Sequence, residues 1–204
     1  TNYSINPEKV LVIYNAVLSN SFFEKSNELV ELNFSNNYLV AVGRLEIVKN
    51  YPFLLNVYSR MKSEIKGFNL DLVILGDGTE RENLKKQILD LKIQDNVHLL
   101  GAVSNPLPII KKAKALVHAS LSESMGLVYI EALALNIPII TTVNKGATEV
   151  LNNIEQKIII DSYDENEFIN GILLMLKKEY SKENPDLDKF RSDKIRDSFL
   201  AIIE

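Results

Sequence analysis

The chain has 204 residues, 46% of them hydrophobic, which is enough for one large domain with a substantial apolar core. Its net charge of −4 argues against nucleic acid as the main partner, because nucleic-acid-binding domains are usually strongly basic. It has no cysteine, which excludes disulfides and thiolate metal sites, and no apolar run approaches the roughly 18 residues that span a membrane.

Residues 1–37 are expected to be a lead-in from an N-terminal domain that this sequence does not contain. Residues 10–14 are apolar and predict a short strand, followed by a turn at Asn15. Residues 19–37 are polar and acidic with scattered apolar positions, so we expect an irregular segment there. The N-terminus shows no secretory signal pattern. Because the chain starts with threonine and not with methionine, we expect a fragment of a longer protein.

Regular alternation of strands and helices begins at Tyr38. Apolar runs predict strands at residues 38–42, 70–75, 97–100, 115–119, 138–141 and 157–160. Between and after them, helices are predicted at residues 52–65, 79–91, 106–113, 125–135, 146–151 and 164–180. Thr79 and Glu82 are expected to form a capping box for the second helix. Beyond a break at Pro185, residues 181–204 are expected to carry a final helix reaching Ile203.

This alternation predicts an α/β fold, in which residues 38–180 form a Rossmann-like parallel sheet with helices on both faces. Ligands of such sheets bind outside the carboxyl ends of the strands. Arg44, Gly76, Gly101 and Ser120 each come just after a predicted strand. They are therefore expected to lie along one edge of the sheet, although they are far apart in sequence.

The most informative stretch runs from Ser120 to Ala134, out of a strand and into a helix. A helix N-terminus favours an anion, and Gly126 would let a ligand approach its backbone closely. Glu123 and Glu131 flank this helix start, and carboxylates accept hydrogen bonds from the paired hydroxyls of a sugar or a ribose. The stretch would suit a sugar joined to a nucleoside by a diphosphate. It also suits ordinary α/β structure, with both glutamates serving only the helix.

Arg44 and Lys49 lie together in the loop after the first strand of the domain. Arginine can hold a phosphate with two parallel N–H groups, and lysine adds a mobile positive charge. They could bind a diphosphate and neutralise its charge as it leaves, or they could be two solvated loop charges. Because the loop is expected at the same sheet edge as Glu123 and Glu131, we favour the diphosphate site.

Several segments, in this order, resemble the C-terminal domain of GT-B glycosyltransferases, in particular glycosyltransferase family 4. They are Gly43-Arg44-Leu45 with Lys49, Gly76-Asp77-Gly78-Thr79-Glu80-Arg81, Leu100-Gly101, Ser120 to Ala132, and Gly146-Ala147 with Glu149. Glu123 and Glu131 match the E-x7-E motif of that family. The resemblance covers about residues 38–180, and residues 10–17 resemble the strand and turn that lead from the family's N-terminal domain.

The resemblance implies a retaining enzyme that moves a sugar from a nucleotide-sugar to an acceptor glycan or lipid, with no metal ion or other cofactor. Arg44, Lys49 and Glu123 would then be the catalytic residues. Arg44 and Lys49 would contact the diphosphate, Glu123 the donor sugar and Glu131 the ribose. The two histidines, at positions 98 and 118, lie in apolar runs and are expected to pack in strands rather than to bind a metal.

The remaining donor-binding residues implied by the resemblance act largely through the backbone. They are expected at the sugar, the phosphates or the nucleobase, the last of these near Ala102 and Val103. The full donor-binding set is Gly43, Arg44, Lys49, Gly76, Ala102, Val103, Glu123, Met125, Gly126, Leu127, Val128 and Glu131. The sequence departs from the family pattern at Asn50, which follows the lysine where the family commonly has glycine.

In the family, the acceptor binds mainly to an N-terminal domain that this chain lacks. We therefore expect the donor-binding half of a bacterial enzyme of polysaccharide biosynthesis, located in the cytoplasm, with peripheral membrane association of the full protein left open. Two alternatives are a GT-B-like sugar-nucleotide epimerase and a non-catalytic nucleotide-binding module. A dinucleotide oxidoreductase is disfavoured, because the strand before Gly43 is not followed by G-x-G-x-x-G.

Overall fold

Six parallel strands form one sheet, in the order β3-β2-β1-β4-β5-β6, within the described part of the chain. The computed structural model describes residues 10–35, 37–180 and 185–203. The strands are β1 (Tyr38–Val42), β2 (Asp71–Leu75), β3 (Val97–Gly101), β4 (Ala115–His118), β5 (Ile139–Thr142) and β6 (Lys157–Ile160). The predicted α/β fold with a Rossmann-like parallel sheet is confirmed.

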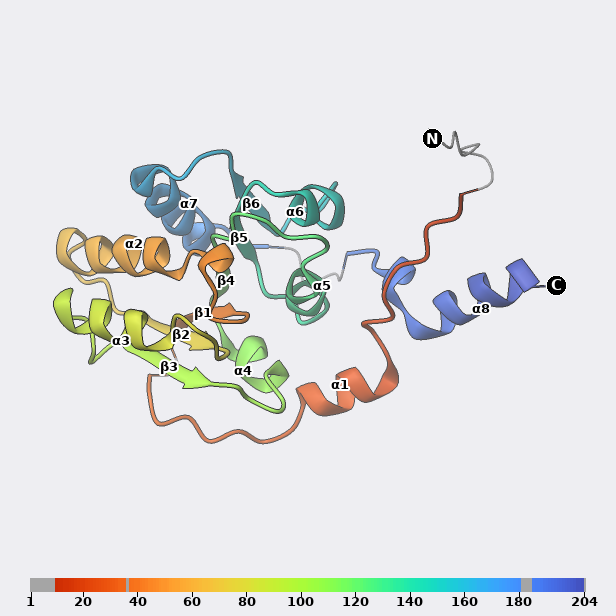
Figure 1. Cartoon of the computed structure of the whole chain (residues 1–204), viewed down its shortest axis with the longest axis horizontal. Helices are drawn as coiled ribbons and strands as arrows, with labels where there is room; N and C mark the ends of the chain where they lie inside the picture. The colour runs from red at the N-terminus through yellow and green to blue at the C-terminus, as the bar shows by residue number, and fades with distance from the viewer. Residues whose placement is uncertain (1–9, 36, 181–184, 204) are drawn as a thin grey trace.

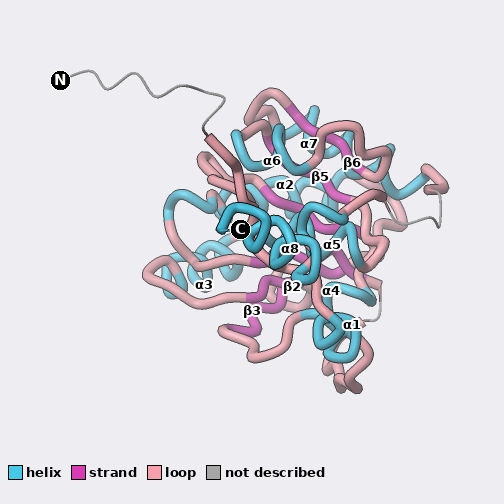
Figure 2. The backbone as a smooth tube through the Cα atoms, turned by 90° about the vertical axis from the view of Figure 1, so that its right-hand side faces the viewer, coloured by secondary structure: helices cyan, strands magenta, loops and turns pink. Residues whose placement is uncertain are grey.

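Helices cover both faces of this sheet, because alternate strand residues point to opposite sides and both sides are apolar (Figures 1 and 2). Leu39 and Leu72 face one core and Val40 and Val73 face the other. The first core is closed by α2 (Tyr51–Glu64), α3 (Arg81–Asp90) and α7 (Glu165–Lys177). The second is closed by α4 (Leu107–Lys112), α5 (Leu127–Ala134) and α6 (Lys145–Val150).

The strand order reverses next to β1, and this reversal positions the candidate site. The chain winds outward from β1 through β2 to β3, then returns through α4 to β4, which pairs with the other side of β1. The loops that follow β1 and β4 therefore leave neighbouring strands at the same edge of the sheet. In open parallel sheets, ligands bind in the crevice at such a switch point.

The predicted strand at residues 10–14 is wrong, and the segment predicted to be irregular, residues 19–37, contains a helix at its start and is irregular from residue 27 to residue 35. No described strand lies beside residues 10–14 to pair with them, and Val12 is 65% exposed. Further on, Ser19 begins the helix α1 (Asn20–Ser26), because its hydroxyl accepts a hydrogen bond from the Phe22 N–H at 3.2 Å. Phe22 is buried against the core, so tertiary packing stabilises a short helix that has little periodicity.

The predicted capping box at Thr79 and Glu82 is also wrong. The helix α3 begins at Arg81, and no side chain caps it. The preceding turn is held by backbone bonds to the β1 loop instead, from Leu45 N to Asp77 O and from Glu80 N to Leu45 O, both 2.9 Å. This turn thus belongs to the edge of the sheet where the candidate site lies.

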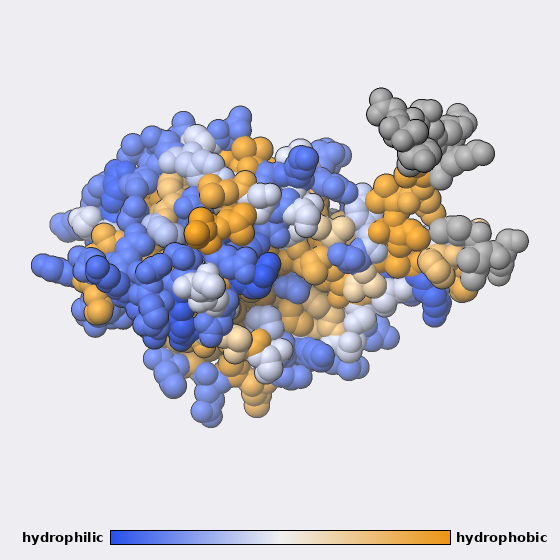
Figure 3. Space-filling model, viewed as in Figure 1, coloured by the Kyte–Doolittle hydropathy of each residue, from blue (hydrophilic) through white to orange (hydrophobic). Residues whose placement is uncertain are grey.

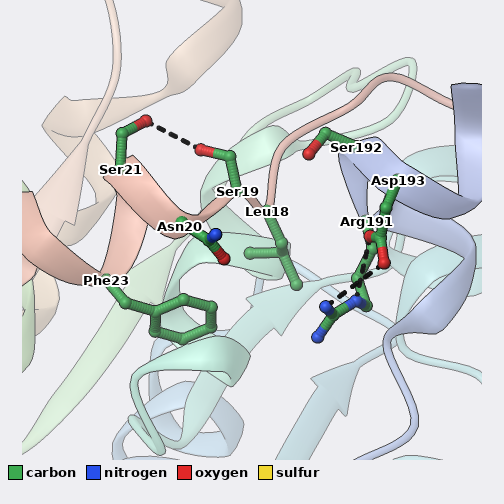
Figure 4. Close-up of a pocket in the computed structure, with 8 residues that line it drawn as sticks. All are labelled: Leu18, Ser19, Asn20, Ser21, Phe23, Arg191, Ser192 and Asp193. Carbon is green, nitrogen blue, oxygen red and sulfur yellow. Dashed lines mark hydrogen bonds and ion pairs between the residues drawn. The ribbon is translucent and has the colours of Figure 1, made fainter.

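The C-terminal segment packs against the lead-in segment. The expected final helix forms as α8 (Ser192–Ile203), after the short 3-10 helix η3 (Asp188–Phe190). The Val17 and Leu18 N–H groups both donate to Phe190 O, at 3.1 and 3.0 Å. A pocket of about 400 Å³ lies between the two segments, with Ser19 and Ser21 on one wall and Arg191 and Asp193 on the other (Figure 4).

Apolar surface gathers on the side of the molecule that carries residues 10–13 and α8 (Figure 3). Leu11 is 62% exposed and Phe199 is 54% exposed. None of the described helices combines the length and the apolar character that a membrane crossing would need.

Replacing Phe190 by alanine tests how far this terminal packing stabilises the fold. Phe190 is fully buried and its ring meets that of Tyr14 edge to face, with centroids 5.2 Å apart. We expect Phe190→Ala to lower the free energy of unfolding by about 3–5 kcal/mol in urea denaturation. The matched control Phe199→Ala removes an exposed ring from α8 and should change it by less than about 0.5 kcal/mol. Equal effects of the two variants would contradict this assignment of the core.

Candidate functional site

The loop after β1 and the loop after β4 meet at the switch point. Val48 O accepts two hydrogen bonds from the second loop, one from Leu121 N at 2.8 Å and one from Ser120 Oγ at 2.9 Å. These bonds bring Lys49 beside Glu123, and Lys49 Nζ donates to Glu123 Oε2. The structure therefore joins two predicted site residues that are 74 positions apart.

The Lys49–Glu123 ion pair is largely buried, with each side chain only 16% exposed. His118, at the end of β4, lies beneath it, with Nε2 3.9 Å from the same carboxylate oxygen. A charge in such a position needs a partner, because removing one member leaves the other charge desolvated and unpaired. An incoming anion could therefore draw Lys49 from Glu123 only by taking over the role of that carboxylate.

Arg44 lies apart from this pair, at the rim of the site. Its side chain is 77% exposed and its guanidinium bonds Glu46 at 2.6 Å. An exposed ion pair of this kind contributes roughly 0–1 kcal/mol, so little holds the guanidinium away from a stronger anion. The backbone of this loop turns at Asn50, whose φ of 51° explains why glycine is common at this position in the family the sequence resembles.

A pocket of about 330 Å³ opens beside Arg44, between the ends of β1, β2 and β3. Five of the predicted donor-binding residues line it: Gly43, Arg44, Gly76, Ala102 and Val103. The other lining residues are Val42, Leu75, Asp77 and Pro106. Mostly apolar walls with backbone edges between them can take a flat ring and hydrogen-bond its rim.

Gly76 makes this pocket possible, because the backbone segments at Gly76 and Gly43 approach each other more closely than a side chain at position 76 would allow. Its φ is +139°, and an added Cβ would overlap with the Gly43 carbonyl oxygen. Its N–H donates to Gly101 O at 2.8 Å, which ties the ends of β2 and β3 together. The sheet edge predicted from the sequence is thus built, at this point, from the backbone of Gly43, Gly76 and Gly101.

The helix α5 begins at Leu127, two residues later than predicted, because Gly126 adopts the left-handed conformation. No side chain caps this helix, whereas Asn144 caps α6 and Asp164 caps α7. The first-turn N–H groups, with the partial positive charge of the helix end, are therefore left without a side-chain acceptor. Leu127 is 43% exposed at this end. An anion could be bound there.

Three further predicted residues lie around the start of α5. Met125 is partly buried in the loop before it and accepts a weak bond from Asn15 Nδ2 at 3.7 Å. Val128 is partly buried in the first turn. Glu131, one turn further along the face of Leu127, is partly buried, and burial raises the pKa of its carboxyl group. Within the described residues its carboxylate forms no hydrogen bond or ion pair, so the carboxylate oxygens are available to a ligand.

His118 and His98 are packed strand residues, as the sequence indicated. His118 is 4% exposed, and burial together with the nearby Lys49 lowers its pKa to about 3. His98 lies at the opposite edge of the sheet, where Nε2 bonds Asp71 Oδ2 at 2.9 Å. No group of three or more histidines and carboxylates among residues 10–35, 37–180 and 185–203 is arranged to hold a metal ion.

The sequence interpretation missed the polar side chains beneath the loop of Glu123. The hydroxyl of Tyr129, on α5, lies 2.9 Å from His118 Nδ1 and 3.0 Å from Thr141 Oγ1. The available signal was a histidine and a threonine at the ends of otherwise apolar strands. It points to a buried polar contact, but only the tertiary structure shows its partner.

Residues 23–191 match the model of a protein family described as "Glycosyl transferases group 1". The chain is also similar to a Campylobacter jejuni protein named N-acetylgalactosamine-N,N'-diacetylbacillosaminyl-diphospho-undecaprenol 4-alpha-N-acetylgalactosaminyltransferase. The two are 32% identical over 177 residues, which is 86% of this chain and 47% of that protein. The chain therefore spans about half the length of this relative.

Two solved structures share the fold. A glycosyltransferase from Rickettsia africae has a TM-score of 0.78 at 18% identity, covering 97% of this chain and 57% of that one. Anabaena Alr3699/HepE, solved in complex with UDP and glucose, has a TM-score of 0.69 at 18% identity, covering 94% and 55%. At this level of identity, the likeness supports the fold.

Gly126→Ala should destabilise the protein more than a left-handed backbone alone explains. A Cβ at Gly126 would overlap with the ring of Tyr129, in addition to the unfavourable φ of +69°. The matched control Gly67→Ala has a φ of +80° and nothing within 4 Å, so it isolates the backbone cost of about 1–2 kcal/mol. We expect Gly126→Ala to exceed the control by a further ~1–3 kcal/mol in urea denaturation. An equal loss of unfolding free energy in Gly126→Ala and Gly67→Ala would show that α5 can shift to accommodate the added Cβ.

Glu131→Gln should stabilise the protein at neutral pH. Burial disfavours the ionised carboxylate in the folded state, so its folded pKa is raised above the unfolded value. Ionisation therefore destabilises the fold fully above the folded pKa, and this penalty disappears below the unfolded pKa of about 4.3. The melting temperature of Glu131→Gln should exceed that of wild type at pH 7, and the two should converge near pH 4. A difference independent of pH would assign the effect to packing.

Proposed function

The chain belongs to the glycosyl transferases group 1 family, and from this we propose that it is the donor-binding half of a retaining family 4 glycosyltransferase. The whole enzyme would move a sugar from a nucleotide-sugar to an acceptor glycan or lipid. The observation that carries this proposal is the arrangement of Lys49, Glu123 and the pocket beside Arg44 at one edge of the sheet.

The geometry supports one orientation of the donor. The nucleobase would enter the 330 Å³ pocket, between Val42 and Val103, and meet the backbone near Ala102. The diphosphate would then lie between Arg44 at the pocket rim and the uncapped start of α5. We propose a uridine nucleotide first, since the Anabaena protein of the same fold was solved with UDP and glucose.

The two carboxylates would recognise hydroxyl groups at either end of the diphosphate. Glu131 has unoccupied oxygens and would accept hydrogen bonds from the ribose. Glu123 would contact the donor sugar, because its carboxylate already lies beside the lysine that would bind the phosphates. In this proposal both carboxylates act as hydrogen-bond acceptors.

Positive charge that is already in position before the reaction would assist departure of the nucleoside diphosphate. Breaking the bond between sugar and phosphate leaves a negative charge on the phosphate oxygen. Lys49, Arg44 and the N–H groups at the start of α5 would stabilise that charge without rearranging solvent. We propose that these groups, with no metal ion or other cofactor, balance the charge of the diphosphate. Lys49 would change partner during this step, from Glu123 to the phosphate.

Acceptor binding and full transfer would require the half of the enzyme that relatives carry in addition. Holding donor and acceptor in reactive geometry is worth up to ~7–11 kcal/mol, and the residues described here would hold only the donor. We propose that the whole protein works in the cytoplasm, at the inner face of a membrane, in bacterial polysaccharide biosynthesis. Nucleotide-sugar and acceptor would be its partners.

Calorimetric titration with UDP, GDP and ADP tests the donor site. We expect one of them to bind, and Arg44→Ala and Lys49→Ala each to weaken its binding tenfold or more. The physical reason is the loss of a charge-assisted hydrogen bond worth ~1.5–3 kcal/mol. The control Lys85→Ala removes an exposed lysine that pairs with Glu82 on α3, and should leave the affinity unchanged. Wild-type affinity in both site variants would refute the diphosphate assignment.

The alternatives predict different chemistry with UDP-glucose. The chain alone should bind this nucleotide-sugar and return it unchanged, as followed by NMR. Appearance of an epimeric sugar would instead identify the chain as an epimerase. Failure of UDP, GDP and ADP alike to bind would contradict both the donor site and a nucleotide-binding module for these three nucleotides.

A further inference from the structure

Four polar side chains from four different segments meet beneath the candidate donor site. Tyr129 of α5 is fully buried, and its hydroxyl lies 2.9 Å from Nδ1 of His118 on β4 and 3.0 Å from Oγ1 of Thr141 on β5. Asn144, which caps α6, donates to the same hydroxyl at 3.3 Å. One tyrosine hydroxyl thus joins α5 to two strands and to the start of the next helix.

The tyrosine ring supports the start of α5. The atoms Cδ2 and Cε2 of Tyr129 lie so close to Gly126 that a Cβ there would overlap with them. The same Cβ would lie 3.2 Å from Cγ of Glu123. The ring of Tyr129 and the side chain of Glu123 are therefore both packed against the backbone at Gly126, so a movement of the ring would be passed to Glu123 through that backbone.

A second contact reaches the carboxylate of Glu123 through His118. The imidazole lies edge to face with Tyr129, at 5.2 Å between centroids, and its Nε2 is 3.9 Å from Glu123 Oε2. Burial and Lys49 lower the pKa of His118 to about 3, and burial raises that of Tyr129 to about 12. Both His118 and Tyr129 therefore stay uncharged at neutral pH.

We propose that Tyr129 is a positioning residue for the donor sugar. Its hydroxyl holds His118, Thr141 and Asn144 in one arrangement, and the first of these packs beside the carboxylate of Glu123 and limits where it can move. The inference rests on the proposed function, in which Glu123 contacts the sugar while Lys49 and Arg44 contact the diphosphate. Losing the hydroxyl therefore impairs recognition of the sugar more than that of the diphosphate.

Tyr129→Phe separates these two effects when binding of UDP and UDP-glucose is measured by calorimetry. The expected result is an affinity for UDP within about threefold of wild type. The ratio of the dissociation constants, UDP-glucose over UDP, should rise at least fivefold. The matched control is Tyr58→Phe, which removes an equally buried hydroxyl that donates to Leu70 O at 2.8 Å, away from the site. It should leave the ratio unchanged.

A double-mutant cycle distinguishes positioning of Glu123 from a general loss of structure. In the Glu123→Gln background the carboxylate is already absent, so adding Tyr129→Phe should no longer change the ratio. His118→Asn keeps a polar group near Tyr129 but removes the nitrogen beside Glu123, and should raise the ratio as Tyr129→Phe does. It provides the same test if Tyr129→Phe does not fold.

Each other outcome overturns the proposal. An unchanged ratio in Tyr129→Phe and in His118→Asn shows that Glu123 is held without them. A rise of equal size with and without the carboxylate of Glu123 shows that the tyrosine acts only on the general structure. If wild type binds UDP but Tyr129→Phe and His118→Asn have the same ratio of dissociation constants as Tyr58→Phe, only the positioning role fails. If wild type binds neither UDP nor UDP-glucose, the proposed uridine donor site fails, and the positioning role with it.

Discussion

The position of β1 between β2 and β4 is the constraint on which the rest of this structure depends. Its backbone pairs with Asp71–Leu75 on one side and, through Leu39 and Val40, with Ala115 and Leu116 on the other. From β1 the chain first adds β2 and β3 on one side, and later adds β4, β5 and β6 on the other side. The helices that connect the strands therefore leave the space between the loops after β1 and β4 open. A crevice follows from this topology before any side chain is considered.

In the proposed donor complex, a ligand would replace an interaction that already exists between charged residues of the crevice. Lys49 and Glu123 are both largely removed from water, and each is stabilised there by the other. A diphosphate would provide Lys49 with a second anion, while Glu123 would turn to hydroxyl groups. Arg44, on the rim, meets no comparable constraint, because its pairing with Glu46 is solvent-exposed. The two basic residues of one loop therefore differ in environment: Lys49 is held in a largely buried ion pair, and Arg44 is solvent-exposed.

The sequence was sufficient to predict the strands, the sheet edge that carries the site and the charged residues at that edge. Each of these depends on local sequence pattern or on the topology of the sheet. Continuous apolar runs predicted all six strands, since a strand covered on both faces leaves no polar alternation. The parallel order then implied that residues after the strand ends, such as Gly76 and Gly101, share one edge. Their backbones indeed bond each other there. By contrast, residues 10–14 have a strand-like composition but no described strand beside them, so composition alone was misleading.

The sequence by itself determined the α/β class, the order of the strands along the chain and the edge to which Lys49, Glu123 and Glu131 belong. Only the tertiary structure decided which groups touch. The pairing of Lys49 with Glu123, and the contacts of Tyr129 with His118 and Thr141, join segments whose separation carries no periodic signal. Hydrophobic patterning reports which face of an element is buried, whereas contacts between polar atoms depend on distances that arise only when the elements pack.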